Sequence, residues 1–104
     1  SKVIVVLGHT ECGAVKGACD DVKLGNLTRT LAAIQPAVAA VKGFEGERNS
    51  KNKAFVDAVT HENVRQTVDN IVERSPVLAA LVGNGKLKVV GAIYDVSSGE
   101  VTFL

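Results

Sequence analysis

The chain has 104 residues, 46% of them hydrophobic and 22% charged, which suits one ordinary globular domain and is too short for two. Its 12 basic and 11 acidic residues leave a formal net charge of +1, which excludes the strongly basic surface typical of nucleic-acid-binding or anionic-membrane-binding proteins. Two cysteines are too few for a disulfide framework. No apolar run is long enough to span a membrane and no signal peptide is visible, so we expect a cytoplasmic location.

The first expected element is a strand at residues 3–7, which are apolar at every position. That pattern predicts a strand covered on both faces, as in a parallel sheet flanked by helices. If this strand is central, one of its edges has no partner strand within the chain, and an exposed apolar edge is prone to association. We therefore expect either an oligomer or a sheet of which this chain supplies only part.

The middle of the chain has a helical pattern. An apolar stripe contains Pro36 and so predicts either a kink or two short helices instead of one straight helix; its members are Leu27, Leu31, Ile34, Val38 and Val41. Residues 43–52 are charged and glycine-rich, which indicates a surface loop. Residues 64–72 repeat apolar side chains at helical spacing, and we expect this helix to start near residues 62–64 and to end before Pro76.

The chain ends with two further expected strands. Residues 87–94 form a second continuous apolar run, in which Gly91 allows a neighbouring element to approach closely. A turn at residues 97–99 precedes a short last strand, which must run antiparallel because so short a turn cannot return the chain to a parallel position. The order predicts an α/β fold: a parallel-strand sheet flanked by helices, with an antiparallel strand at its carboxy-terminal edge.

The Gly-His-Thr-Glu-Cys-Gly segment at residues 8–13 allows three kinds of site. A phosphate loop would use Gly8 and Gly13, which have the spacing of the Walker A motif. The motif then requires Lys and Ser or Thr, and this chain has Ala14 and Val15, so the segment lacks both the phosphate-binding charge and the magnesium-binding hydroxyl.

Thiol catalysis is the second interpretation. Cys12 lies near an expected helix N-terminus, and His9 is a possible base for its thiol. However, the chain has no Cys-x-x-Cys motif and no residue assignable as the group that orients His9. Cys19 follows two helical turns later, where a small buried apolar role is commoner than that of a resolving thiol.

A metal site is the third interpretation. His9 and Cys12 are placed to ligate one divalent ion, and a mixed nitrogen and sulfur donor set suits zinc. Open α/β sheets bind ligands at the carboxyl ends of their strands, which is where this segment lies. Two donors do not fill a tetrahedral shell, so a structural histidine beside a buried cysteine remains an equal alternative on spacing alone.

A resemblance distinguishes these interpretations. The segment VVLGHTECGAVKGA closely resembles the second zinc-ligand segment of β-class carbonic anhydrases, a strand followed by Gly-His-x-x-Cys-Gly. The tail VVGAIYDVSSGEVTFL is similar to the last two strands of that family, and the helical segment before it is similar as well. The resemblance implies that His9 and Cys12 are two of three protein ligands to Zn²⁺. It also implies reversible hydration of carbon dioxide to bicarbonate and a homodimer or higher oligomer.

One departure from the family pattern limits what the resemblance implies for this chain. The family's upstream Cys-x-Asp-x-Arg segment, which supplies another zinc ligand and an active-site Asp–Arg pair, has no counterpart here. We therefore expect residues 1–104 to form one domain corresponding to the carboxy-terminal part of a β-carbonic anhydrase, in which we identify no catalytic residue. The alternative is that the chain is an inactive structural or interaction fragment with an incomplete zinc site.

Five other residues have weaker claims to a role at or near this site. We expect Glu11 to be a solvated loop carboxylate and His61 to be a surface residue. Cys19 is poorly placed to replace the missing ligand, because it lies two turns along a helix. Tyr94 and Asp95 match the tail motif of the family and are expected to anchor the turn to the last strand.

Overall fold

A computed structural model describes residues 2–104 and contains a mixed sheet of three strands in the order β1-β2-β3. β1 (Lys2–His9) pairs in parallel with β2 (Leu87–Tyr94), and β2 pairs antiparallel with β3 (Val101–Phe103). The register places His9 opposite Tyr94 at the carboxyl ends of the parallel pair. The predicted α/β class and the antiparallel last strand are therefore confirmed.

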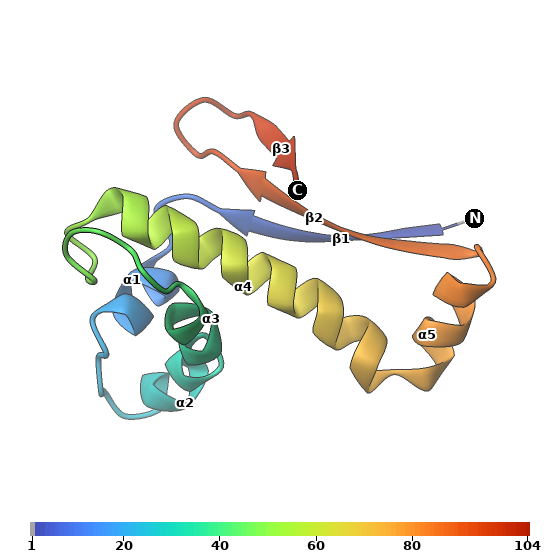
Figure 1. Ribbon diagram of the computed structural model, residues 1–104, viewed down its shortest axis with the longest axis horizontal. Coiled ribbons are helices and arrows are strands. Elements are labelled where there is room, and N and C mark those ends of the chain that lie inside the picture. Colours follow the sequence, from blue (N-terminus) through green and yellow to red (C-terminus); the bar gives the residue numbers. More distant parts are fainter. Residues whose placement is uncertain (1) are drawn as a thin grey trace.

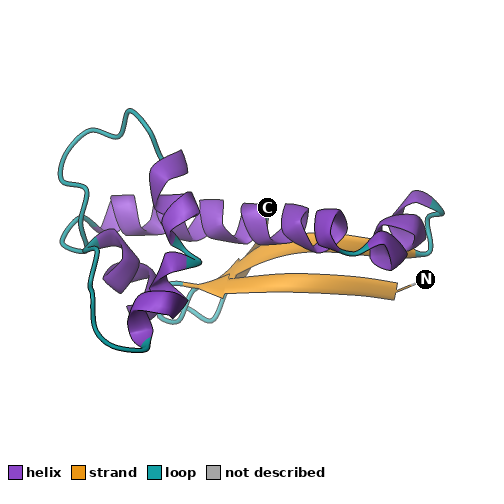
Figure 2. Ribbon diagram, turned by 90° about the horizontal axis from the view of Figure 1, so that it is seen from below, coloured by secondary structure: helices purple, strands orange, loops and turns teal. Residues whose placement is uncertain are grey.

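Five helices connect β1 to β2: α1 (Gly13–Cys19), α2 (Leu27–Ala32), α3 (Gln35–Ala40), α4 (Lys53–Arg74) and α5 (Pro76–Gly83). Figure 1 shows α4 running along β1 and β2, with α1, α2 and α3 gathered at the end where β1 leads into α1. α5 lies at the opposite end, as the rotated view in Figure 2 also shows. Of the helices described, none is both long enough and apolar enough to cross a membrane.

Proline and side-chain caps set the helix boundaries. The predicted break at Pro36 is confirmed, since Pro36 lies in the first turn of α3, where its missing N–H costs nothing. α4 begins after Asn52, whose side chain accepts a hydrogen bond from the backbone N–H of Phe55. Ser75, the residue before Pro76, ends α4 and caps α5 through a bond from the backbone N–H of Leu78.

The start of α4 corrects the sequence prediction. The expected start near residues 62–64 was wrong by about three turns of helix, because the Asn52 cap lies far upstream of the periodic segment. His61 therefore lies inside α4 and not before a helix, and its side chain is exposed as predicted.

Two glycines let α4 lie very close to the sheet. A Cβ atom added to Gly8 would lie 2.6 Å from Val64 Cγ2, and one added to Gly91 would lie 2.7 Å from Val64 Cγ1. The close approach predicted at Gly91 is thus confirmed, and the contacting element is α4. On another side of α4, a buried cluster joins α1, α3 and α4; it contains Val15, Cys19, Ala37, Phe55, Val56 and Val59.

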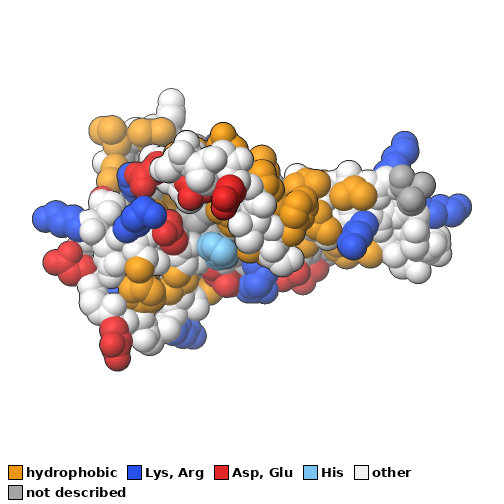
Figure 3. All heavy atoms as spheres, turned by 90° about the horizontal axis from the view of Figure 1, so that it is seen from above, with side chains coloured by type: hydrophobic (Ala, Val, Ile, Leu, Met, Phe, Trp, Pro, Cys, Tyr) orange, Lys and Arg blue, Asp and Glu red, His pale blue; other side chains and the backbone are white. Residues whose placement is uncertain are grey.

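The predicted burial of the first strand on both faces was wrong for the chain as described. Among residues 2–104, only α4 and α5 pack against the sheet, and β1 is an edge strand and not a central one. Because side chains alternate along a strand, one face of the sheet is left uncovered. We call this the open face; its exposed apolar residues are Val3, Val5, Leu7, Tyr94, Val101 and Phe103. Figure 3 shows hydrophobic side chains gathered over the strands on this side.

Candidate metal centre

The His9–Cys12 loop joins β1 to α1. His9 is the last residue of β1, and Cys12 immediately precedes α1 with an extended backbone conformation (φ −77°, ψ 117°). Glu11 between them adopts a left-handed conformation with φ 57°, which turns the chain sharply. Both predicted ligands therefore lie at the carboxyl end of a parallel strand, the usual position of ligand sites in open α/β sheets.

The His9 ring is oriented by the backbone of the next residue. Its Nδ1 lies 2.8 Å from the carbonyl oxygen of Thr10. A carbonyl oxygen can only accept, so in the neutral imidazole the proton is on Nδ1 and Nε2 keeps its lone pair. The exposed side chain thus presents Nε2 for ligation, in the arrangement common among metal-binding histidines.

Cys12 is a free thiol, half-buried at the start of α1. It packs against the buried cluster that contains Val15 and Cys19, and its carbonyl oxygen accepts the first bond of the helix from the Lys16 N–H, 3.0 Å away. The backbone at Cys12 is therefore held by both packing and hydrogen bonding.

The carboxy-terminal strands hold the same loop from the other side. The Thr10 N–H donates to the Tyr94 carbonyl over 3.0 Å, and the Thr10 hydroxyl accepts from the Val96 N–H over 3.1 Å. The Asp95 N–H donates to the Glu100 carbonyl over 2.8 Å, and this bond closes the turn before β3. The structural role expected for Tyr94 and Asp95 is confirmed. Thr10 was missed, although a hydroxyl residue directly after a strand was a signal for such a link.

Glu11 has the predicted character of a solvated carboxylate. It is exposed and forms an ion pair with Lys16 Nζ at 2.5 Å. The hydrogen bond and positive charge of Lys16 lower the pKa of Glu11 below the usual range of a glutamate. The negative charge of Glu11 is thus paired with Lys16 on α1.

The other candidate donors lie elsewhere. Cys19 is buried in the core with 7% of its surface exposed, and burial raises the pKa of its thiol, which disfavours the thiolate that a metal needs. His61 lies on the exposed side of α4. Within residues 2–104, no three His, Cys, Asp or Glu residues are grouped closely enough to hold a metal ion.

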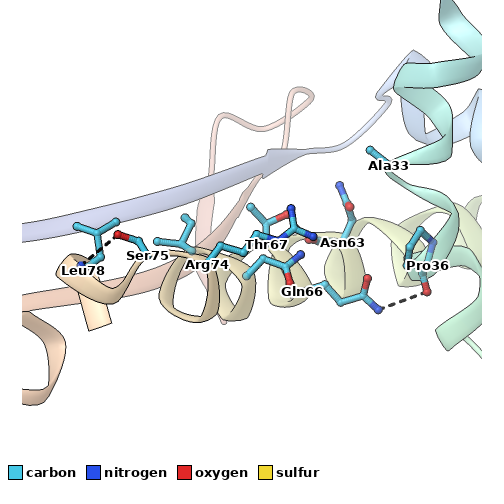
Figure 4. A pocket seen from close by; sticks show the side chains of 10 residues that line it. Ala33, Pro36, Asn63, Gln66, Thr67, Arg74, Ser75 and Leu78 are labelled. Atoms are coloured by element: carbon cyan, nitrogen blue, oxygen red, sulfur yellow. Dashed lines mark hydrogen bonds between the residues drawn. The ribbon is translucent and has the colours of Figure 1, made fainter. Parts of the chain in front are cut away.

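A groove of about 610 Å³ lies away from this loop, between α4 and the ends of α3 and α5. Figure 4 shows Asn63, Gln66 and Thr67 of α4 along it, with a hydrogen bond from the Gln66 amide to the Pro36 carbonyl. Its lining has no carboxylate, imidazole or thiol, so it offers none of the donors that zinc prefers. We therefore do not regard this groove as the candidate metal site, despite its volume.

The donor set of the His9–Cys12 loop fits zinc in kind but is incomplete in number. An imidazole nitrogen and a thiolate are typical zinc ligands, and a catalytic zinc site needs three protein donors. A phosphate loop is disfavoured because Val15, at the position of the Walker hydroxyl, is buried in the core with 4% of its surface exposed.

Comparison with known proteins gives one consistent result. The family described as carbonic anhydrase matches residues 1–101. A carbonic anhydrase of Pseudomonas aeruginosa is 29% identical over 101 residues, which cover 97% of this chain and 46% of that protein. Carbonic anhydrase 2 of Mycobacterium tuberculosis is 30% identical over 98 residues, with 94% and 46% covered.

Solved structures agree with the sequence relatives. The crystal structure of a β-carbonic anhydrase of Aspergillus fumigatus matches with a TM-score of 0.78 and 29% identity, over 98% of this chain and 48% of that one. A Coccomyxa β-carbonic anhydrase in complex with acetazolamide matches with a TM-score of 0.76 and 25% identity, over 99% and 46%. The chain thus spans about half the length of the relatives it matches. By sequence and by fold, it belongs to the β-class carbonic anhydrase family.

Proposed function

We propose that His9 and Cys12 are two protein ligands of a zinc ion, in a protein that catalyses the reversible hydration of carbon dioxide to bicarbonate. The observation that carries the proposal is the loop itself. In a chain of this family, an exposed imidazole whose Nδ1 is engaged and a thiol three residues on both lie at the carboxyl end of β1. No third donor is grouped with them among residues 2–104, so we expect the missing donor to come from another polypeptide segment.

Each residue of the loop has a defined task in this proposal. His9 binds as the neutral imidazole through Nε2, while its Nδ1–H stays on the Thr10 carbonyl. Cys12 binds as the thiolate, held by the first turn of α1. When bound, zinc acts as a Lewis acid that lowers the pKa of water to about 7 and so supplies a nucleophile near neutral pH. Because both donors must be deprotonated, zinc affinity is expected to fall in acid.

A second candidate rests on the incomplete donor set. With two donors among residues 2–104, the chain by itself could act as a structural or interaction element that binds zinc weakly and has no lyase activity. The open face fits this candidate, because it could bind another protein. It fits the enzyme equally well, because it could be covered by another part of the enzyme.

Metal content and carbon dioxide hydration separate the two candidates. In a protein with a complete site, we expect about one zinc per chain by elemental analysis and catalysed hydration by stopped-flow. His9→Ala should remove both, while His61→Ala, which alters an exposed histidine of α4, should change neither. Zinc-binding protein that hydrates carbon dioxide only at the uncatalysed rate would support the fragment and contradict the enzyme. Zinc-free protein with a rapidly alkylated Cys12 would favour thiol chemistry instead.

We also infer that the protein works as a homodimer or a larger homo-oligomer. The open face and the free edge of β1 expose large apolar side chains next to unpaired backbone groups, a combination that favours association. Sedimentation velocity over a range of concentrations measures this directly.

A further inference from the structure

The N–H and hydroxyl of Thr10 join the His9–Cys12 loop to the carboxy-terminal segment, and its carbonyl oxygen holds the His9 ring. The N–H of Thr10 donates to the Tyr94 carbonyl, its hydroxyl accepts from the Val96 N–H, and its carbonyl oxygen accepts from Nδ1 of His9. The first two bonds link residues more than eighty positions apart in the sequence, and the third orients a predicted ligand. Thr10 is thus the only residue of the loop bonded both to the His9 ring and to the strand that follows α5, among the residues described.

The turn that is bonded to the Thr10 hydroxyl is itself held by several hydrogen bonds. Within residues 95–100, the Asp95 N–H donates to the Glu100 carbonyl and the Asp95 carbonyl accepts from the Gly99 N–H, each over 2.8 Å. The Asp95 carboxylate also accepts from the Ser97 N–H over 2.8 Å, in an Asx turn. Val96 therefore presents its N–H to Thr10 from a backbone that its neighbours already hold in place.

We propose that Thr10 is a positioning residue for the metal centre, through which the carboxy-terminal turn sets the orientation of His9; this inference rests on the zinc site proposed above. The Thr10 hydroxyl fixes the peptide whose carbonyl holds Nδ1–H of His9, and that bond in turn aims Nε2 at the ion. Without the hydroxyl, Thr10 is tied to the carboxy-terminal strands only by its N–H, which belongs to the preceding peptide group. The next peptide group, whose carbonyl holds the His9 ring, can then turn about the Cα–C bond of Thr10.

The inference has a reciprocal consequence. If the bond between Thr10 and Val96 strengthens metal binding, then bound metal must strengthen that bond by the same factor. The Val96 N–H is hydrogen-bonded to the Thr10 hydroxyl on an exposed residue, so its exchange rate reports on this bond.

The test compares variants by Co²⁺ titration, read from the thiolate-to-cobalt charge-transfer absorption. Thr10→Val keeps the side-chain shape and removes the hydroxyl, and Thr10→Ser keeps the hydroxyl. Thr102→Val makes the same change at an exposed threonine of β3. Direct outer contacts of metal ligands change affinity by about 10- to 100-fold. Thr10 acts one peptide further away, so we expect Thr10→Val to weaken Co²⁺ binding by about 3- to 10-fold. Thr10→Ser and Thr102→Val should stay near the unaltered chain.

A measurement on the unaltered chain keeps the inference testable even if Thr10→Val fails to fold. Amide hydrogen exchange of Val96 should slow when Co²⁺ is added, by about the factor that Thr10→Val costs in affinity. Equal Co²⁺ affinity for Thr10→Val, equal weakening by Thr10→Ser, or Val96 exchange that ignores Co²⁺ would each overturn the role of Thr10. A failure of the protein with its complete donor set to bind Co²⁺ would contradict the metal site itself, and this inference with it.

Discussion

The two faces of the sheet differ in packing far more than in composition. On the face toward α4, Gly8 and Gly91 bring the strands so close to the helix that Val64 occupies the space of their missing side chains. On the open face, valine, leucine and phenylalanine side chains of the same strands face solvent, with Val3 at 60% and Phe103 at 63% exposure. The comparison teaches that apolar content alone does not stabilise a strand, because the free energy comes from area removed from water and from close contact.

The largest contrast is expected between two phenylalanines. Phe55 of α4 is fully buried in the cluster between α1, α3 and α4. The centre of its ring lies 5.4 Å from the centre of the Phe44 ring and 4.7 Å from the Arg48 guanidinium carbon. Phe55→Ala should lower the free energy of unfolding by about 3–5 kcal/mol. Phe103→Ala, the same change on the open face, should cost about 0.5 kcal/mol or less. Urea unfolding monitored by circular dichroism measures both.

The same pair of variants also tests what the open face does. If that face mediates association, Phe103→Ala should reduce self-association in sedimentation velocity while leaving the fold intact. A similar stability loss for both variants would mean that the open face is packed in the protein. A concentration-independent monomer for the unaltered chain would contradict an oligomer built on it.

A smaller effect is expected where the helix meets the sheet. Gly91→Ala would place a Cβ atom 2.7 Å from Val64, which is buried and β-branched and so cannot turn aside cheaply. We expect a loss of about 1–3 kcal/mol in the free energy of unfolding, measured by the same urea experiment.

Two matched changes check the cause of this loss. Gly83→Ala, near the end of α5, meets no atom within 4 Å and should be neutral or stabilise by up to about 1 kcal/mol. Combining Gly91→Ala with Val64→Ala should cost less than the sum of the two single changes, because the steric conflict is then removed. Additive costs would show that the glycine is needed for another reason.

The smallest effect concerns a polar link on the helical side of the molecule. Both Asp20 carboxylate oxygens accept bonds from Ser50, from its N–H over 2.7 Å and from its hydroxyl over 2.6 Å. The hydroxyl bond and then the N–H bond lower the pKa of Asp20. Its contribution to stability is therefore complete above the usual aspartate pKa of about 3.9 and is lost as the pH falls through the lowered value.

Thermal unfolding across this acidic range tests the link. Asp20→Asn should lower the midpoint temperature of unfolding slightly at neutral pH, and this temperature should then decrease less as the pH falls. Asp21→Asn keeps the Asp20–Ser50 link, so its midpoint temperature should decrease in acid as much as that of the unaltered chain. An acid dependence of Asp20→Asn identical to that of the unaltered chain would contradict this role for Asp20.

Much of the fold followed from local patterns. Uninterrupted apolar runs marked β1 and β2, Pro36 marked the break between α2 and α3, and the short turn before β3 required an antiparallel strand. These features depend on backbone sterics and on neighbours in sequence, so one sequence was enough to predict them. The start of α4 was missed because the prediction relied on residues 64–72 alone, although buried side chains at helical spacing already follow the Asn52 cap.

The same division holds for the candidate site. Sequence alone predicted His9 and Cys12 as candidate metal ligands and placed them at the end of a strand. Only the tertiary structure showed that Nδ1 of His9 is engaged by Thr10, that Thr10 is tied to a turn far along the chain, and that Cys19 belongs to the core. It also decided that one face of the sheet is packed and the other is open, because burial depends on which elements meet in space and a run of valines is the same string in either environment.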